Sequence, residues 1–179
     1  IGKLQLSPDS VVYDIGAGTG SVSIEIAQGA PDIQVYAIEK NEEALELLEK
    51  NKQKFAADNI EIIGGLAPTV LENLPVPTHA FIGGSSGNME EILQKVFEKN
   101  PECRVVVNTI ALNSISKLME ILEQNKEYQF DIVQMQTSVA KKAGDYQLMM
   151  GQNPIYIVTI WKEKEHEAKD SKANDSRNE

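Results

Sequence analysis

The residues best suited to chemistry lie in a glycine-rich turn, Asp14-Ile15-Gly16-Ala17-Gly18-Thr19-Gly20-Ser21, at the end of an apolar run. Glycines at a strand-to-helix junction let the backbone approach a ligand closely, and the free amides there can bind a polar or anionic group. Two common phosphate-binding loops are excluded. The dinucleotide fingerprint would need glycine at Ser21, and a Walker loop would end in Gly-Lys-Ser/Thr. A tight turn with a satisfied Asp14 remains the structural alternative.

Small and polar residues also follow the other predicted strands. Glu39 closes the second strand, and Gly64-Gly65-Leu66-Ala67-Pro68 follows the third. Gly83-Gly84-Ser85-Ser86-Gly87 follows the fourth, and Asn108 and Thr109 end the fifth. Doubly wound folds bind ligands at the carboxyl ends of their strands, so these residues are candidates for one crevice. The alternatives are a surface Glu39, a plain turn at 64–68, and a flexible loop that caps a helix from Asn88.

Short apolar runs alternate with amphipathic stretches over the first two thirds of the chain. The runs predict strands at 11–15, 34–39, 60–63, 79–82 and 104–108, and the stretches predict helices at 21–28, 41–55, 88–98 and 114–124. This alternation indicates a parallel sheet covered by helices on both faces. Two last strands, at 130–139 and 155–161, have no clear helix between them at 141–153, so they are expected to be antiparallel.

Length and composition limit the classes of protein to which this chain can belong. The 179 residues correspond to about one domain, which we assign to 1–162, followed by a charged, disordered tail at 163–179. The net charge of −10 disfavours a nucleic-acid partner. No run approaches the roughly 20 apolar residues of a membrane span, and no signal peptide is evident. The single Cys103 fits a reducing compartment, so we expect a cytoplasmic protein.

The acidic residue, the Gly-x-Gly-x-Gly turn and Glu39 at the next strand end together resemble the class I S-adenosylmethionine-dependent methyltransferases. The resemblance implies a Rossmann-like, doubly wound, mostly parallel seven-stranded sheet with an antiparallel last strand. It also implies roles in holding S-adenosyl-L-methionine. Asp14 would help to hold the amino group, and Glu39 would accept bonds from the ribose hydroxyls. The methionine part would lie against Gly16, Ala17, Gly18, Thr19 and Gly20, and the adenine against Leu66 and Ala67.

Longer segments are similar to one narrower family. The runs 12–23, 81–85, 107–112, 141–144 and 149–154 resemble the decarboxylating precorrin methyltransferases of cobalamin synthesis. That family methylates carbon 15 of a corrin precursor and removes carbon dioxide from the acetate chain on carbon 12. Its members usually carry an upstream segment with a Pro-Met-Thr-like motif. Because this chain begins at Ile1, we expect such a segment to be missing.

The resemblance implies a tetrapyrrole substrate with several carboxylates, with or without cobalt. Gly83, Gly84, Ser85, Asn108 and Thr109 are then candidates to contact it, and Lys141 and Lys142 to pair with its carboxylates. Two solvated loop lysines are the equal alternative, and Asn113 is a candidate cap of the next helix. Relatives imply a homotetramer, and some carry a fused carbon-5 methyltransferase domain, so fusion to such a domain or partnership with it is open.

Other functions remain possible on the sequence alone. They are a class I methyltransferase for another small molecule or a protein, a dehydrogenase, and a cofactor-binding subunit that is inactive without its missing segment. No metal site is expected, because His79 and His166 have no partner histidine or cysteine at metal spacing. The reaction demands no particular acid or base, so no catalytic residue is assigned. We expect Cys103 to be a small apolar core residue.

Overall fold

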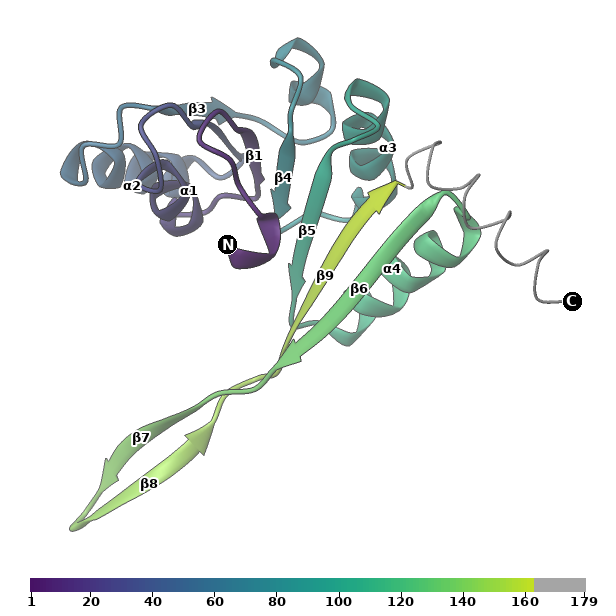
Figure 1. Ribbon diagram of the computed structural model, residues 1–179. Helices are drawn as coiled ribbons and strands as arrows, with labels where there is room; N and C mark the ends of the chain where they lie inside the picture. Colours follow the sequence, from purple (N-terminus) through teal and green to yellow (C-terminus); the bar gives the residue numbers. More distant parts are fainter. Residues whose placement is uncertain (163–179) are drawn as a thin grey trace, which may run out of the picture.

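The computed structural model describes residues 1–162, and the predicted tail at 163–179 lies outside the described residues. A seven-stranded sheet runs through the molecule in the order β3-β2-β1-β4-β5-β9-β6 (Figure 1). Its strands are β1 (Val11–Ile15), β2 (Gln34–Glu39), β3 (Ile60–Gly64), β4 (His79–Ile82), β5 (Arg104–Thr109), β6 (Tyr128–Met135) and β9 (Ile155–Lys162). The predicted strands at 11–15, 34–39 and 79–82 agree with β1, β2 and β4 at both ends.

The strand directions confirm the predicted fold class. The first five strands pair in parallel, whereas β9 is antiparallel to both β5 and β6. The chain moves outward from β1 through β2 to β3 and then returns to β4 on the other side of β1. The strand order therefore reverses between β1 and β4, and the carboxyl ends at such a reversal form a natural crevice.

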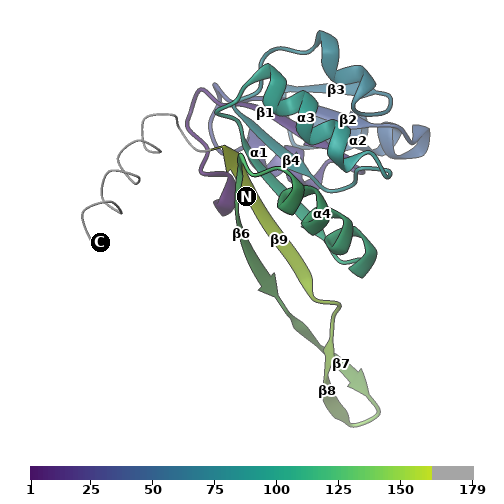
Figure 2. The same ribbon diagram turned by 90° about the vertical axis from the view of Figure 1, so that its right-hand side faces the viewer.

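Helices cover both faces of this sheet. One core cluster joins the sheet to the 3-10 helix η2 (Thr69–Asn73), α3 (Met89–Lys99) and α4 (Leu112–Gln124). The other joins it to the 3-10 helix η1 (Gly2–Leu4), α1 (Ser21–Ala27) and α2 (Glu42–Lys54). Figure 2 shows α3 and α4 over one face. On β5, Val105 and Val107 face the first layer and Val106 the second, so the strand is apolar on both sides.

The helices form where the sequence predicts them because their apolar faces and ends are well defined. On α3, the side chains of Met89, Ile92, Leu93, Val96 and Phe97 are buried along one face. Helix α2 begins after Asn41, whose side chain accepts the Ala44 N–H at 2.9 Å. The alternative that Asn113 caps α4 is wrong. The helix begins at Leu112, with Ala111 in the cap position.

The end of the chain differs from the prediction. The single strand expected at 130–139 is divided into β6 and β7 (Ser138–Ala143), and the stretch at 141–153 contains the rest of β7 and β8 (Tyr146–Gly151). Strands β7 and β8 form a two-stranded hairpin that projects beyond the main sheet (Figure 1). Every residue of the two strands is exposed. Because neither strand has a face that packs on the core, the sequence there lacks the regular spacing of apolar residues from which a strand is predicted.

Two other residues considered in the sequence, Cys103 and His79, have structural roles. Cys103 is fully buried, in agreement with its expected place in the core, and burial raises the pKa of its thiol to about 12. His79 contacts the Thr78 hydroxyl at 2.8 Å, and burial together with the Arg104 charge lowers its pKa.

Within residues 1–162, no helix is long and apolar enough to cross a membrane.

Candidate functional site

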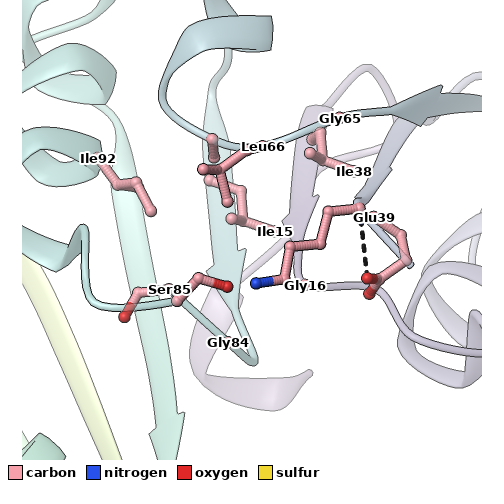
Figure 3. A pocket seen from close by; sticks show the side chains of 12 residues that line it. Ile15, Gly16, Ile38, Glu39, Gly65, Leu66, Gly84, Ser85 and Ile92 are labelled. Carbon is pink, nitrogen blue, oxygen red and sulfur yellow. Dashed lines mark hydrogen bonds between the residues drawn. The ribbon is translucent and has the colours of Figure 1, made fainter.

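A cavity of about 160 Å³ opens where the ends of β1, β2, β3 and β4 meet (Figure 3). Strands β1 and β2 contribute to it directly, the turns after β3 and β4 form the other sides, and α3 adds one side chain. Its lining residues are Ile15, Gly16, Ile38, Glu39, Lys40, Gly65, Leu66, Ala67, Gly84, Ser85, Ser86 and Ile92. The structure therefore brings together residues from the first four predicted strand ends, at the point where the strand order reverses.

The floor of the pocket is a direct contact between two glycine turns. Gly16 has a φ of 75°, and a Cβ placed there would lie 2.7 Å from the backbone N and O of Gly84. The Ile15 carbonyl accepts the N–H of Gly83 at 2.9 Å and that of Gly84 at 3.3 Å. Because a side chain at residue 16 would separate the turns, the sequence needs glycine there. Gly84 lines the pocket, whereas the predicted Gly83 does not.

Glu39 ties the glycine turn to the end of β2. Its Oε2 accepts the Gly18 N–H at 2.8 Å, and its Oε1 accepts the N–H of Lys40 at 2.8 Å and of Asn41 at 2.9 Å. The bond from Lys40 is the dashed line in Figure 3. A carboxylate has about four acceptor sites, so three are already in use. To bind both hydroxyls of a ribose, Glu39 would have to share or release one of these backbone bonds.

The last residues of the turn, Thr19 and Gly20, pack against helix α2. A Cβ at Gly20, whose φ is 83°, would lie 2.0 Å from Leu48 Cδ1 of α2. The Asn51 amide of the same helix donates to the Thr19 carbonyl at 2.9 Å. Ala17, Gly18, Thr19 and Gly20 do not line the pocket, so their predicted contact with a cofactor stays a prediction. Thr19 and Gly20 contact α2, whereas the Ala17 N–H donates to the Ile38 carbonyl of β2 at 3.0 Å.

Asp14 lies beneath the turn and is almost completely buried. The Ser23 hydroxyl donates to its Oδ2 at 2.5 Å, and its Oδ1 has no hydrogen-bond partner among the described residues. Burial raises the pKa of this carboxyl to about 6, against the bonds from Ser23, and the Glu39 charge adds to the increase. Asp14 does not line the pocket, so its predicted contact with the amino group of a cofactor stays a prediction. The unpartnered Oδ1 is the observation that favours this prediction.

The turn after β3 forms the opposite wall. Gly65 donates its N–H to the Glu39 carbonyl at 2.9 Å, and a Cβ on it would lie 2.4 Å from Val70 Cγ1. Leu66 and Ala67 both line the pocket, as the prediction for a flat ring requires. The Asn88 side chain does not cap α3. It donates to the Ala67 carbonyl at 3.2 Å and so joins this turn to the turn after β4.

Only some of the predicted substrate residues line this pocket. Ser85 lines it together with Gly84, whereas Asn108 and Thr109 end the neighbouring strand β5 and do not. Asn108 Oδ1 is buried and has no partner within the described residues, and Thr109 Oγ1 accepts the Ala111 N–H at 3.3 Å. These roles stay predictions.

The lysine pair lies on the hairpin. Lys141 and Lys142 are both exposed on β7, where they face Leu148 and Gln147 of β8. The structure does not bring them to the pocket of their own chain. Their predicted contact with substrate carboxylates therefore requires an assembly in which the hairpin of one chain reaches the pocket of another.

Five side chains of the pocket were assigned no role from the sequence, and one of them, Ser86, directly follows the predicted Ser85. Ile15 and Ile38 adjoin predicted residues at the ends of β1 and β2, and Lys40 follows Glu39 directly. The strand ends were the available signal for these three. Ile92 lies on α3, and only the packing of that helix over the sheet turns it toward the cavity (Figure 3).

The pocket is built for binding and positioning. Among the described residues, no group of three or more His, Cys, Asp or Glu side chains could hold a metal ion. The lining contains a close backbone approach at Gly16 and Gly84, one carboxylate at Glu39 and an apolar wall at Leu66. This combination fits a ligand that has a slender polar part, vicinal hydroxyls and a flat apolar ring. A nucleoside that carries an amino-acid chain has these features.

Comparison with known proteins points to one family. The sequence model of the precorrin methyltransferase domain matches residues 1–164. The cobalt-precorrin-6B C(15)-methyltransferase (decarboxylating) of Salmonella typhimurium is 35% identical over 167 residues, which cover 93% of this chain and 86% of that protein.

Solved structures agree with this similarity. The precorrin-6y C5,15-methyltransferase of Geobacter metallireducens has a TM-score of 0.83 at 37% identity, covering 90% of this chain and 84% of that one. The precorrin 8W decarboxylase of Methanobacterium thermoautotrophicum has a TM-score of 0.80 at 30% identity, covering 88% and 84%. Both therefore share the fold over nearly the whole described chain.

The buried carboxyl of Asp14 predicts a pH-dependent stability. Between the ordinary pKa of 3.8 and the folded value of about 6, the folded protein keeps a proton that the unfolded chain releases. Asp14 therefore costs stability as the pH rises through this window, by about 3 kcal/mol in total. We expect Asp14→Asn to gain stability relative to the native protein between pH 4 and pH 7. Urea unfolding at each pH measures this difference.

The exposed Asp32→Asn provides the matched control, because its difference from the native protein should change little over the same range. A difference for Asp14→Asn that stays constant from pH 4 to pH 7 would contradict the assigned protonation.

Proposed function

Because this chain belongs to the precorrin methyltransferase family, we propose that it methylates carbon 15 of a precorrin or cobalt-precorrin in cobalamin biosynthesis. In the same reaction the acetate chain on carbon 12 loses its carboxyl group as carbon dioxide. The Salmonella relative carries both steps in its name, C(15)-methyltransferase (decarboxylating). The observation that carries the proposal is the family match over the whole described chain, including all four strand ends that form the pocket.

We propose S-adenosyl-L-methionine as the methyl donor, since its sulfonium supplies an activated methyl group. The fit rests on three features of the pocket. Gly16 and Gly84 leave room for the methionine part, Glu39 offers a carboxylate to the ribose, and Leu66 offers an apolar wall to the adenine. Asp14 would act from beneath the turn, where its buried carboxylate favours a nearby positive charge.

The substrate side is proposed at the turn after β4 and the end of β5. Gly84 and Ser85 border the pocket, and the absence of large side chains there leaves space for a flat macrocycle. Asn108 adds a buried oxygen that lacks a partner in the described part of the chain. Lys141 and Lys142 would pair with substrate carboxylates only if an assembly carries a hairpin to a pocket.

The chemistry asks the protein mainly for alignment. An electron-rich carbon of the reduced tetrapyrrole can accept the methyl group directly, and the conjugated ring can accept the electrons that the departing carbon dioxide leaves behind. Holding donor and acceptor together can supply about 7–11 kcal/mol of the barrier. This agrees with a pocket whose lining side chains include no His, Cys or Tyr.

An anaerobic incubation with S-adenosylmethionine and cobalt-precorrin-6B, followed by mass spectrometry, tests this function. We expect a product that has gained a methyl group and lost carbon dioxide, with one S-adenosylhomocysteine formed for each. Omission of the methyl donor is the control and should leave the substrate intact. A product that gains the methyl group and keeps the carboxyl would contradict the decarboxylating step.

We further propose that the chain forms a homo-oligomer, a tetramer by the resemblance to its family. The support is the hairpin of β7 and β8, whose strands pair with each other and with no other described strand. Val139, Tyr146, Leu148 and Met150 lie on one face of it, and each is about half exposed or more. A lone two-stranded hairpin is at best marginally stable in water. A second copy of the chain would cover this face.

Charges on this face should therefore break the assembly. We expect the double variant Leu148→Lys, Met150→Lys to elute as a monomer, while the native chain elutes as a tetramer, in size-exclusion chromatography with light scattering. Gln147→Lys, on the opposite face, is the control and should keep the tetramer. A double variant that remains tetrameric would exclude this face as the interface. A cytoplasmic location and a carbon-5 methyltransferase partner stay predictions.

A further inference from the structure

Acidic side chains are distributed unevenly around the crevice. Asp14 and Glu39 lie at the ends of β1 and β2. Residues 73–89 contain β4 and the turn after it, and residues 103–119 contain β5 and the first part of α4. Neither stretch has a single Asp or Glu, although the chain has 27 of them. One side of the site therefore favours a cation, and the other side tolerates an anion.

A lysine belongs to the side without acidic residues. Lys117, on α4, donates from its Nζ to the Gly87 carbonyl at 3.2 Å. Gly87 directly follows Ser86, which lines the pocket together with Gly84 and Ser85. Figure 3 shows Gly84 and Ser85 at one edge of that pocket. Lys117 thus contacts the turn that borders the pocket without lining the pocket itself.

The ammonium group of Lys117 can bind a further acceptor. A lysine has three N–H donors, and the Gly87 carbonyl uses one of them. Among the described side chains, no carboxylate lies within ion-pair distance of Lys117, including Glu90 of α3 and Glu120 of α4. The side chain is exposed, so its remaining donors are accessible to a ligand.

The turn between the pocket and Lys117 is open to a large ligand. A Cβ built at Gly84 or at Gly87 would meet no atom within 4 Å. The cavity itself measures about 160 Å³, which is too small for a methyl donor and a macrocycle together. A flat ring whose reacting carbon lies at the pocket would therefore extend over this turn, and its substituted rim would lie outside the cavity.

We propose that Lys117 binds a carboxylate on the rim of the tetrapyrrole, across the turn after β4 from the methyl donor. This inference rests on the proposed function. The carboxylate is one that the reaction retains. A cation beside the acetate of carbon 12 would stabilise the carboxylate that must leave as carbon dioxide, and binding of the ground state alone does not accelerate a reaction.

Titration of cobalt-precorrin-6B into the chain saturated with S-adenosylhomocysteine tests this proposal, with light absorption of the macrocycle as the signal. We expect Lys117→Met to raise the dissociation constant about three- to tenfold, which is the ordinary value of one hydrogen bond. Lys117→Arg keeps the charge and should stay within about twofold of the native chain. Lys126→Met, an exposed lysine beyond the other end of α4, is the matched control and should bind like the native chain.

Calorimetry with S-adenosylhomocysteine alone separates substrate binding from a structural role. If Lys117 only held the turn through Gly87, Lys117→Met would weaken this ligand as much as the substrate. We expect its affinity for S-adenosylhomocysteine to equal that of the native chain. Added salt should also weaken substrate binding more in the native chain than in Lys117→Met, because an exposed charge pair is screened.

Two results would overturn the inference. They are an unchanged substrate affinity in Lys117→Met, and an equal loss of affinity for substrate and for S-adenosylhomocysteine in that variant. Failure of cobalt-precorrin-6B to bind the native chain would instead overturn the proposed function. The two failures are therefore distinguishable in one set of titrations.

Discussion

The contact between the Gly16 turn and the Gly84 turn determines the shape of the pocket. It joins the ends of β1 and β4 across the point where the strand order reverses, and the Ile15 carbonyl holds both residues of the second turn. Glu39 fixes the first turn from the side of β2. Backbone atoms therefore make the floor of the site, and side chains enter only at its walls. A site of this kind is rigid because its geometry depends on main-chain hydrogen bonds rather than on flexible side chains.

This construction explains why so few ionisable groups are needed. A methyl group bound to a sulfonium and an electron-rich ring are both reactive, so the protein contributes mostly by placing them. The two carboxylates nearest the turn serve different purposes. Glu39 is bonded to three amides at the border of the pocket, whereas Asp14 is buried beneath the turn with one free oxygen. Both increase the negative potential at a place where a positively charged donor would be bound.

The core of the fold could be predicted from sequence because buried parallel strands read as short, continuous apolar runs. The limits of β2 and β4 agree with the prediction, and Glu39, Leu66 and Ser85 do line one pocket. The hairpin of β7 and β8 could not be foreseen, since none of its residues packs on the core of its own chain. Ile92 was missed for a different reason. Its place in the pocket depends on how α3 packs over the sheet, and spacing along the chain does not contain that information.

Binding of S-adenosylhomocysteine to Gly84→Val is the most direct test of the central claim that these two turns form the cofactor site. A Cβ at Gly84 meets no atom within 4 Å, so a side chain there fills the pocket without straining the fold. The native chain and the control Gly2→Val, also in open space, should bind in calorimetry. Gly84→Val should keep its thermal stability and lose at least about a hundredfold in affinity, as expected when bulk replaces ligand contacts. Native affinity in Gly84→Val would contradict the account.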